Sequence, residues 1–130
     1  MENLNIKCII PGKATGGKVS VFEEVVAPAF GPPLHTHENQ LEIFHVLSGH
    51  IQFELDGKRF DVTAGGTATI PPGMPHAFTN KSEGESVIHF ELLPSGSSED
   101  FFHNLASGNF EDLPQFFSDH GLKLLGPPIQ

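Results

Sequence analysis

Short runs of alternating apolar and polar residues, several rich in β-branched side chains, recur along the first two thirds of the chain. They predict strands at 18–27, 35–37, 41–47, 51–55, 59–62, 67–70, 76–79 and 87–92. Turn-forming residues separate these runs, among them Asp56-Gly57 and the segment 71–75. Eight short strands in about 75 residues leave little room for crossover helices. The pattern therefore predicts a closed antiparallel barrel or jelly roll.

Beyond the last predicted strand the pattern changes to helical spacing. One short helix is expected to begin after Ser97 and to end at Gly108, and a second is expected between Asp112 and Gly121. This helical tail, at about 98–121, has an apolar face. It either covers the outside of the barrel or forms a lid over its open end.

Length and composition limit the architecture and the partners. The 130 residues fit a single domain, 1–130, in which the barrel occupies about 18–94. The chain contains 14 Gly and 11 Pro, as expected for many strands joined by tight turns. Its formal charge of −9 argues against nucleic acid or an anionic membrane as partner, because both require clustered Lys and Arg.

The N-terminal residues lack a basic segment followed by a long apolar one, and no apolar run approaches the length of a membrane span. The single cysteine, Cys8, cannot form an internal disulfide and is expected in an N-terminal strand. We therefore expect a soluble, cytoplasmic protein.

Three histidines and one glutamate have the spacing of a metal site. His35 and His37 are two residues apart, so they face the same side of a strand, whereas Glu42 has the opposite parity to His35. A turn at 38–40 resolves this difference by placing Glu42 on a new strand. His76 follows the proline-rich corner at 71–75 and comes from far along the sequence.

With this spacing the chain resembles a small single-domain cupin. The first family motif is H-x-H, four residues, E, six residues and G; the second is G, five residues, P-x-G, two residues, H, three residues and N. The chain meets both at His35, His37, Glu42, Gly49, Gly65, Pro71, Gly73, His76 and Asn80. Only the glycine that precedes the first histidine departs from the pattern, since three residues and not five separate Gly31 from His35. The resemblance implies an all-β, double-stranded β-helix barrel with a metal ion held by His35, His37, Glu42 and His76.

Strand parity also predicts which side chains surround these ligands. Phe44 and Val46 share the face of Glu42, and Phe78 shares that of His76, whereas His45 faces away. Ile51 and Phe53 are expected to line the same cavity. Such an apolar chamber suits a flat or hydrophobic substrate, although the same residues would also make an ordinary barrel core.

Three neutral imidazoles and one carboxylate would leave a divalent ion with a net charge of +1. A six-coordinate ion would keep two open positions. Nitrogen and oxygen donors without thiolate suit Fe, Mn, Ni, Co or Zn, and the sequence does not choose among them.

Pro94, Phe101-Phe102 and the C-terminal Gly126-Pro127-Pro128 resemble bacterial cupins of the quercetin dioxygenase type, more loosely than the ligand motifs do. This resemblance implies a dioxygenase for a small aromatic or enolic substrate, with Glu42 as the base that takes a proton from a bound hydroxyl. A metal-dependent isomerase, epimerase or lyase of a small polar metabolite and a non-catalytic ligand-binding module stay open.

Family members of this size usually pair, so we also expect a homodimer, with Ile43 and Leu47 as apolar outward positions.

Overall fold

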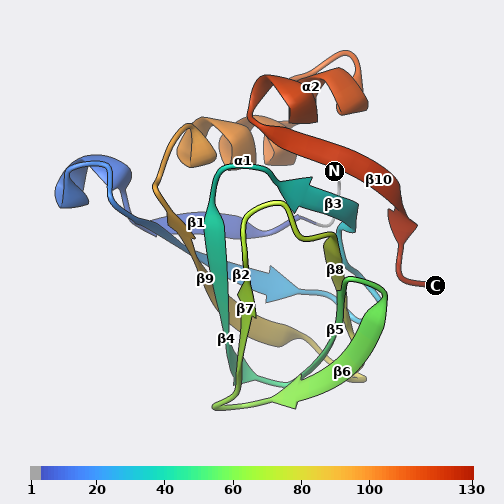
Figure 1. Cartoon of the computed structure of the whole chain (residues 1–130). Helices are drawn as coiled ribbons and strands as arrows, with labels where there is room; N and C mark the ends of the chain where they lie inside the picture. Colours follow the sequence, from blue (N-terminus) through green and yellow to red (C-terminus); the bar gives the residue numbers. More distant parts are fainter. Residues whose placement is uncertain (1–3) are drawn as a thin grey trace.

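The computed structural model describes residues 4–130 and folds them into two antiparallel sheets with two helices at one end (Figure 1). In chain order the elements are β1 (Ile6–Ile10), a 3-10 turn (Gly12–Thr15), β2 (Ser20–Val26), β3 (Pro33–His37), β4 (Leu41–Ser48), β5 (His50–Leu55), β6 (Lys58–Thr63), β7 (Thr67–Ile70), β8 (His76–Asn80), β9 (Ser86–Leu93), α1 (Ser98–Ser107), α2 (Leu113–Asp119) and β10 (Leu122–Pro128). One sheet has the order β1-β2-β9-β4-β7 and the other β10-β3-β8-β5-β6. This arrangement confirms the predicted all-β barrel.

Alternation of side chains fixes the inner face of each sheet. In β2 and β9 every second residue is buried, and β4 follows the same rule from Glu42 to Val46. The inward residues of both sheets meet in one core that contains Phe22, Phe53 and Phe90, each at most 2% exposed. Burial of these large rings supplies much of the driving force for folding.

All eight strands expected from the sequence are present, each with ends shifted by about two residues at most. Cys8 lies in an N-terminal strand, β1, as expected, and its side chain is exposed and unpaired. The strand β10 was not predicted, because Gly126, Pro127 and Pro128 are depleted in strands. It is tolerated at the edge of the second sheet, where it pairs with β3 and where the register shifts at Gly126 and Pro128.

Several motif residues other than the four predicted ligands hold the barrel together. The Asn80 side chain donates hydrogen bonds to the carbonyl oxygens of Val26 and Gly84, both at 2.9 Å, and so ties the 81–85 loop to β2. Gly31 passes so close to β8 that a Cβ atom there would lie 1.7 Å from the carbonyl oxygen of Phe78. The chain therefore needs a glycine at this point, where three residues and not five separate it from His35.

Both helices lie at the same end of the barrel, and β10 runs from α2 back along β3 (Figure 1). They begin and end close to the predicted residues: α2 is capped by the Asp112 side chain, which accepts from the Gln115 amide at 3.4 Å. Ser97 precedes α1 without capping it, because its hydroxyl lies 2.7 Å from Nδ1 of His120. Between residues 4 and 130 no helix is long and apolar enough to span a membrane.

Candidate metal centre

Three strands bring the four predicted ligands together. His35 and His37 come from β3, Glu42 from β4 and His76 from β8. His35 lies directly opposite His76 in the β3–β8 pair, and the turn at 38–40 rotates Glu42 onto the inner face. One donor atom of each residue lies within 4.8 Å of the others, and all four side chains are buried. The sequence prediction that these residues converge is confirmed.

Each imidazole is oriented by an acceptor on its Nδ1 side. Nδ1–H of His35 donates to the Pro33 carbonyl oxygen at 2.7 Å, and Nδ1–H of His76 donates to the Met74 carbonyl oxygen at 3.0 Å. A carbonyl can only accept, so the proton is on Nδ1 in both rings. Nε2 then faces the cluster, which is the arrangement that metal-bound histidines require.

Gln40 plays the same part for His37. Its Oε1 accepts from Nδ1–H of His37 at 3.2 Å. Its Nε2 is surrounded by acceptors, the carbonyl oxygens of Pro94 and Ser95 and the hydroxyl of Ser98, at 2.8 to 3.2 Å. Those acceptors determine which way the amide points. The turn of the first motif is thereby held to the segment that leads into α1.

The Nε2 atoms converge on the Glu42 carboxylate. Oε1 of Glu42 lies 3.0 Å from Nε2 of His76 and 3.4 Å from Nε2 of His37. Burial lowers the pKa of His35 well below its usual value, with further lowering by His76 and His37. Burial also lowers the pKa of His37, although Glu42 opposes the change. In its neutral form His37 presents a lone pair to a carboxylate oxygen, a contact that a bound cation would turn from repulsive to attractive.

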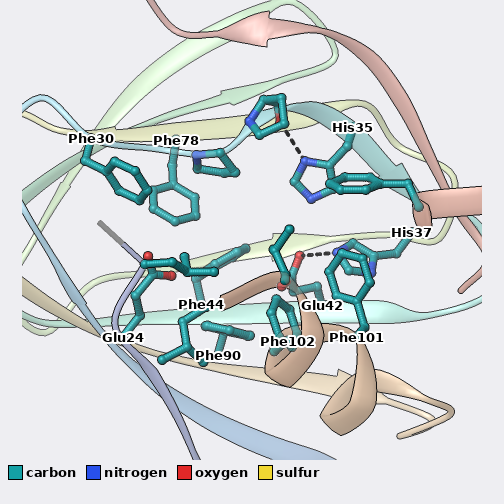
Figure 2. A pocket seen from close by; sticks show the side chains of 16 residues that line it. Glu24, Phe30, His35, His37, Glu42, Phe44, Phe78, Phe90, Phe101 and Phe102 are labelled. Atoms are coloured by element: carbon teal, nitrogen blue, oxygen red, sulfur yellow. Dashed lines mark hydrogen bonds and ion pairs between the residues drawn. The ribbon is translucent and has the colours of Figure 1, made fainter. Parts of the chain in front are cut away.

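The cluster opens into an apolar cavity of about 50 Å³ (Figure 2). Barrel strands supply Phe44, Phe78 and Phe90, and the helices contribute Phe101, Phe102, Leu105 and Phe117. The Phe117 ring lies edge-on to His35 with centroids 6.0 Å apart. Residues of both helices line the cavity beside the histidines, so the helical tail covers this end of the barrel and not only its outer surface.

A family model for the cupin domain matches residues 22–103, which include all four clustered residues. The chain belongs to the cupin family. It is 33% identical to the quercetin 2,3-dioxygenase of Bacillus subtilis over 86 residues, 62% of this chain and 24% of that protein. It is also 36% identical to an uncharacterized protein of Methanocaldococcus jannaschii over 70 residues, 54% of this chain and 56% of that one. The cupin thus spans a quarter to somewhat more than half of these relatives.

Solved structures agree on the fold. A predicted oxalate decarboxylase from Thermotoga maritima superposes with a TM-score of 0.67 at 21% identity, covering 70% of this chain and 80% of that one. At this identity the likeness concerns the barrel alone.

The cavity of this cupin includes only some of the side chains that parity assigned to it. Phe44 and Phe78 line it, as predicted. Val46, Ile51 and Phe53 also point inward, but they are almost fully buried in the core and do not line the cavity. Strand parity predicts which face a side chain occupies but not its depth along the barrel axis. The prediction that these three side chains line the cavity is therefore wrong, although their inward orientation is as predicted.

Histidines on the outer face of the first sheet do not contribute to the cluster. His45 faces away from Glu42, as predicted, and pairs with Glu91 on β9. Nε2 of His89 lies 2.9 Å from a carboxylate oxygen of Glu23. These pairs are partly exposed to solvent, so they contribute little to stability.

Sequence reasoning missed one buried carboxyl group, that of Glu24. It lines the same cavity and is 3% exposed. Burial, with a smaller contribution from Glu42, raises the pKa of Glu24 to about 8. A signal was present in the sequence, because Glu24 occupies the inward series of β2 between Phe22 and Val26.

Proposed function

We propose that this cupin is a metal-dependent dioxygenase for a small aromatic or enolic substrate. The carrying observation is the buried cluster of three imidazoles and one carboxylate, which opens on one side into a cavity walled by phenylalanines. The likeness to a quercetin 2,3-dioxygenase supports the choice of reaction. The oxygen and nitrogen donors fit Fe, Mn, Ni, Co or Zn, and no thiolate is among them.

The fit of a divalent ion rests on the ligands themselves. Nδ1–H groups of His35, His37 and His76 are engaged by other acceptors, so their Nε2 atoms are directed at the shared site. When bound, such an ion would supply Lewis acidity toward a substrate hydroxyl, and Fe, Mn, Ni or Co, unlike Zn, would also supply redox chemistry for the reaction with dioxygen.

The residues of the chain supply the remaining chemistry. The Glu42 carboxylate, at the inner wall of the cavity, accepts the proton of the substrate hydroxyl and leaves an electron-rich phenolate or enolate. Phe101, Phe102 and Phe117 exclude water from that anion. Both atoms of one dioxygen molecule enter the product, so no external reductant is required.

The size of the cavity limits the substrate. Its roughly 50 Å³ is less than the approximately 150 Å³ of a cavity that accommodates benzene. A ring-sized substrate therefore enters only when side chains of α1 and α2 move aside, as expected for helices that form a lid. Small catechols and enols are better first substrates to test than flavonols.

The test combines elemental analysis of the purified protein with oxygen uptake. We expect one transition metal ion per chain and one dioxygen consumed per molecule of catechol or enol converted. Conversion of a small polar metabolite without oxygen uptake would instead support an isomerase, epimerase or lyase. Tight binding of the same compounds without turnover would support a binding module.

A further inference from the structure

Glu24 is placed where a barrel core normally has an aliphatic residue. It lies on β2 directly between Ile6 of β1 and Ile88 of β9, and its side chain enters the core-facing series of that strand. Its carboxyl group borders the cavity and forms no hydrogen bond with residues 4–130, although the residue is only 3% exposed. Leaving a buried polar group unsatisfied is costly, and a leucine there would avoid the cost.

The position of this carboxyl group relative to the metal cluster suggests a use. Glu24 lines the same cavity as His35, His37 and Glu42, and the rings of Phe44 and Phe90 lie between the two ends (Figure 2). The cavity consequently has one polar group at one end, three polar groups at the other and an apolar middle. Ligand sites have this composition, in which a few polar groups set orientation within a mostly apolar wall.

We propose that Glu24 is a positioning residue that binds the end of the ligand remote from the metal cluster, by donating a hydrogen bond from its carboxyl group to a carbonyl oxygen. This inference rests on the proposed function and narrows its substrate class. The substrate is a planar, mainly apolar molecule with an ionisable hydroxyl at one end and a carbonyl at the other.

The electrostatics of the site agree with a donor at this place. The raised pKa of Glu24 keeps its carboxyl group protonated near neutral pH, so it carries an O–H. Its neighbour Glu23 behaves in the opposite way, because it faces outward and a hydrogen bond from His89 lowers its pKa.

The experiment compares two ligands that differ only at the remote end. The protein is loaded with Zn²⁺ to prevent redox chemistry, and its metal content is measured. Dissociation constants of 4-methylcatechol and 3,4-dihydroxybenzaldehyde are then obtained by calorimetry for the wild type, Glu24→Gln and Glu24→Leu. Glu23→Gln, changed at the adjacent outward residue, is the matched control.

We expect the preference for the aldehyde over the methyl compound to fall about tenfold in Glu24→Leu, because the carbonyl loses its donor. Glu24→Gln should keep most of the preference through its N–H group, and Glu23→Gln should not alter it. Comparing ratios across variants cancels the electronic effect of the aldehyde on the catechol.

Two results would overturn the inference while leaving the proposed function intact. One is an equal preference in the wild type and Glu24→Leu, and the other is Zn²⁺-loaded protein that binds neither catechol. A protein that takes up no metal would instead refute the proposed function itself. Loss of binding of both ligands in Glu24→Leu would assign Glu24 a structural role and would also contradict positioning.

Discussion

The two ends of the cavity solve the problem of buried polar groups in different ways. At one end His35, His37 and His76 are each held by an acceptor on Nδ1 and share the carboxylate of Glu42. At the other end Glu24 has no such partner among residues 4–130. A cluster so completely oriented is organised to hold a cation, whereas an isolated carboxyl group is organised for something that enters the cavity.

Both ends cost stability in the absence of their partners. Desolvation lowers the pKa of His35 and His37 and raises that of Glu24, which shows that each environment disfavours the charged form. Both ends are therefore desolvated alike, and they differ in the kind of ligand that each is suited to bind. Changing residues at one end at a time separates the two effects.

The largest effect is expected from His76→Ala at the cluster. This change removes one of the four donors and leaves a gap beneath His35 and Glu42, so the purified variant should contain no stoichiometric metal. Its melting temperature should no longer rise when metal is added, because binding to the folded state is lost. Metal content and thermal unfolding with and without added metal measure both outcomes.

His45→Ala is the matched control, since His45 is on the outer face of the first sheet. The His45→Ala variant should keep the metal content of the wild type. Full metal content in His76→Ala would remove this residue from the ligand set.

The next effect is expected from Glu42→Gln, which separates binding from chemistry. Gln keeps the shape and one oxygen donor but accepts no proton, so the metal should stay bound with lower affinity. Turnover of a hydroxylated substrate should fall about 100-fold or more. Glu91→Gln on the outer face is the control. An unchanged rate in Glu42→Gln would exclude this residue as the base.

The sequence predicted the cluster end of the cavity well, because its information is local. Parity placed His35 and His37 on one face, a turn at 38–40 was expected to bring Glu42 to them on a new strand, and the two motifs added His76. Strand positions followed from alternation and from turn residues. None of this depends on how the elements are packed in three dimensions.

The other parts of the site depend on packing and could not be predicted with the same certainty. Gln40 orients His37 only because the segment before α1 returns to the turn at 38–40. The helices contact the cavity because α2 continues into β10, which pairs with β3. The Gly and Pro residues of β10 kept this strand from being predicted from the sequence. Glu24 had the correct parity, but its lack of a partner becomes visible only when its surroundings are known.

A smaller effect at the cluster end is expected from Gln40→Ala. The change leaves Nδ1–H of His37 without its acceptor and frees the ring to rotate, so metal affinity should fall about 10- to 100-fold without abolishing the site. Competition with a chelator measures the affinity. Asn39→Ala, in the same turn but exposed, should bind metal like the wild type. Equal affinity in Gln40→Ala would mean that the β3 backbone alone orients His37.

The last effect concerns the Glu24 end and the pH dependence of stability in metal-free protein. Because the folded pKa of about 8 exceeds the unfolded value, the folded state binds more protons between these two values. Wild-type stability should therefore fall as pH rises from about 4.5 to 8, by up to about 5 kcal/mol at the full shift. The Glu24→Leu variant lacks this loss. Its free energy of unfolding should therefore exceed that of the wild type by more at pH 8.5 than at pH 5.

Denaturant unfolding at the two pH values measures the difference. Glu23→Gln is the control, with an effect of opposite sign. The pKa of Glu23 is lowered in the folded protein, so its ionised carboxylate contributes to stability above the unfolded pKa. That contribution is lost as pH falls through the folded pKa. The Glu23→Gln variant should therefore have no higher free energy of unfolding than the wild type at pH 8.5. If Glu24→Leu had the same advantage at both pH values, the Glu24 carboxyl group would titrate as in the unfolded chain, and the donor proposed for the ligand would be ionised at neutral pH.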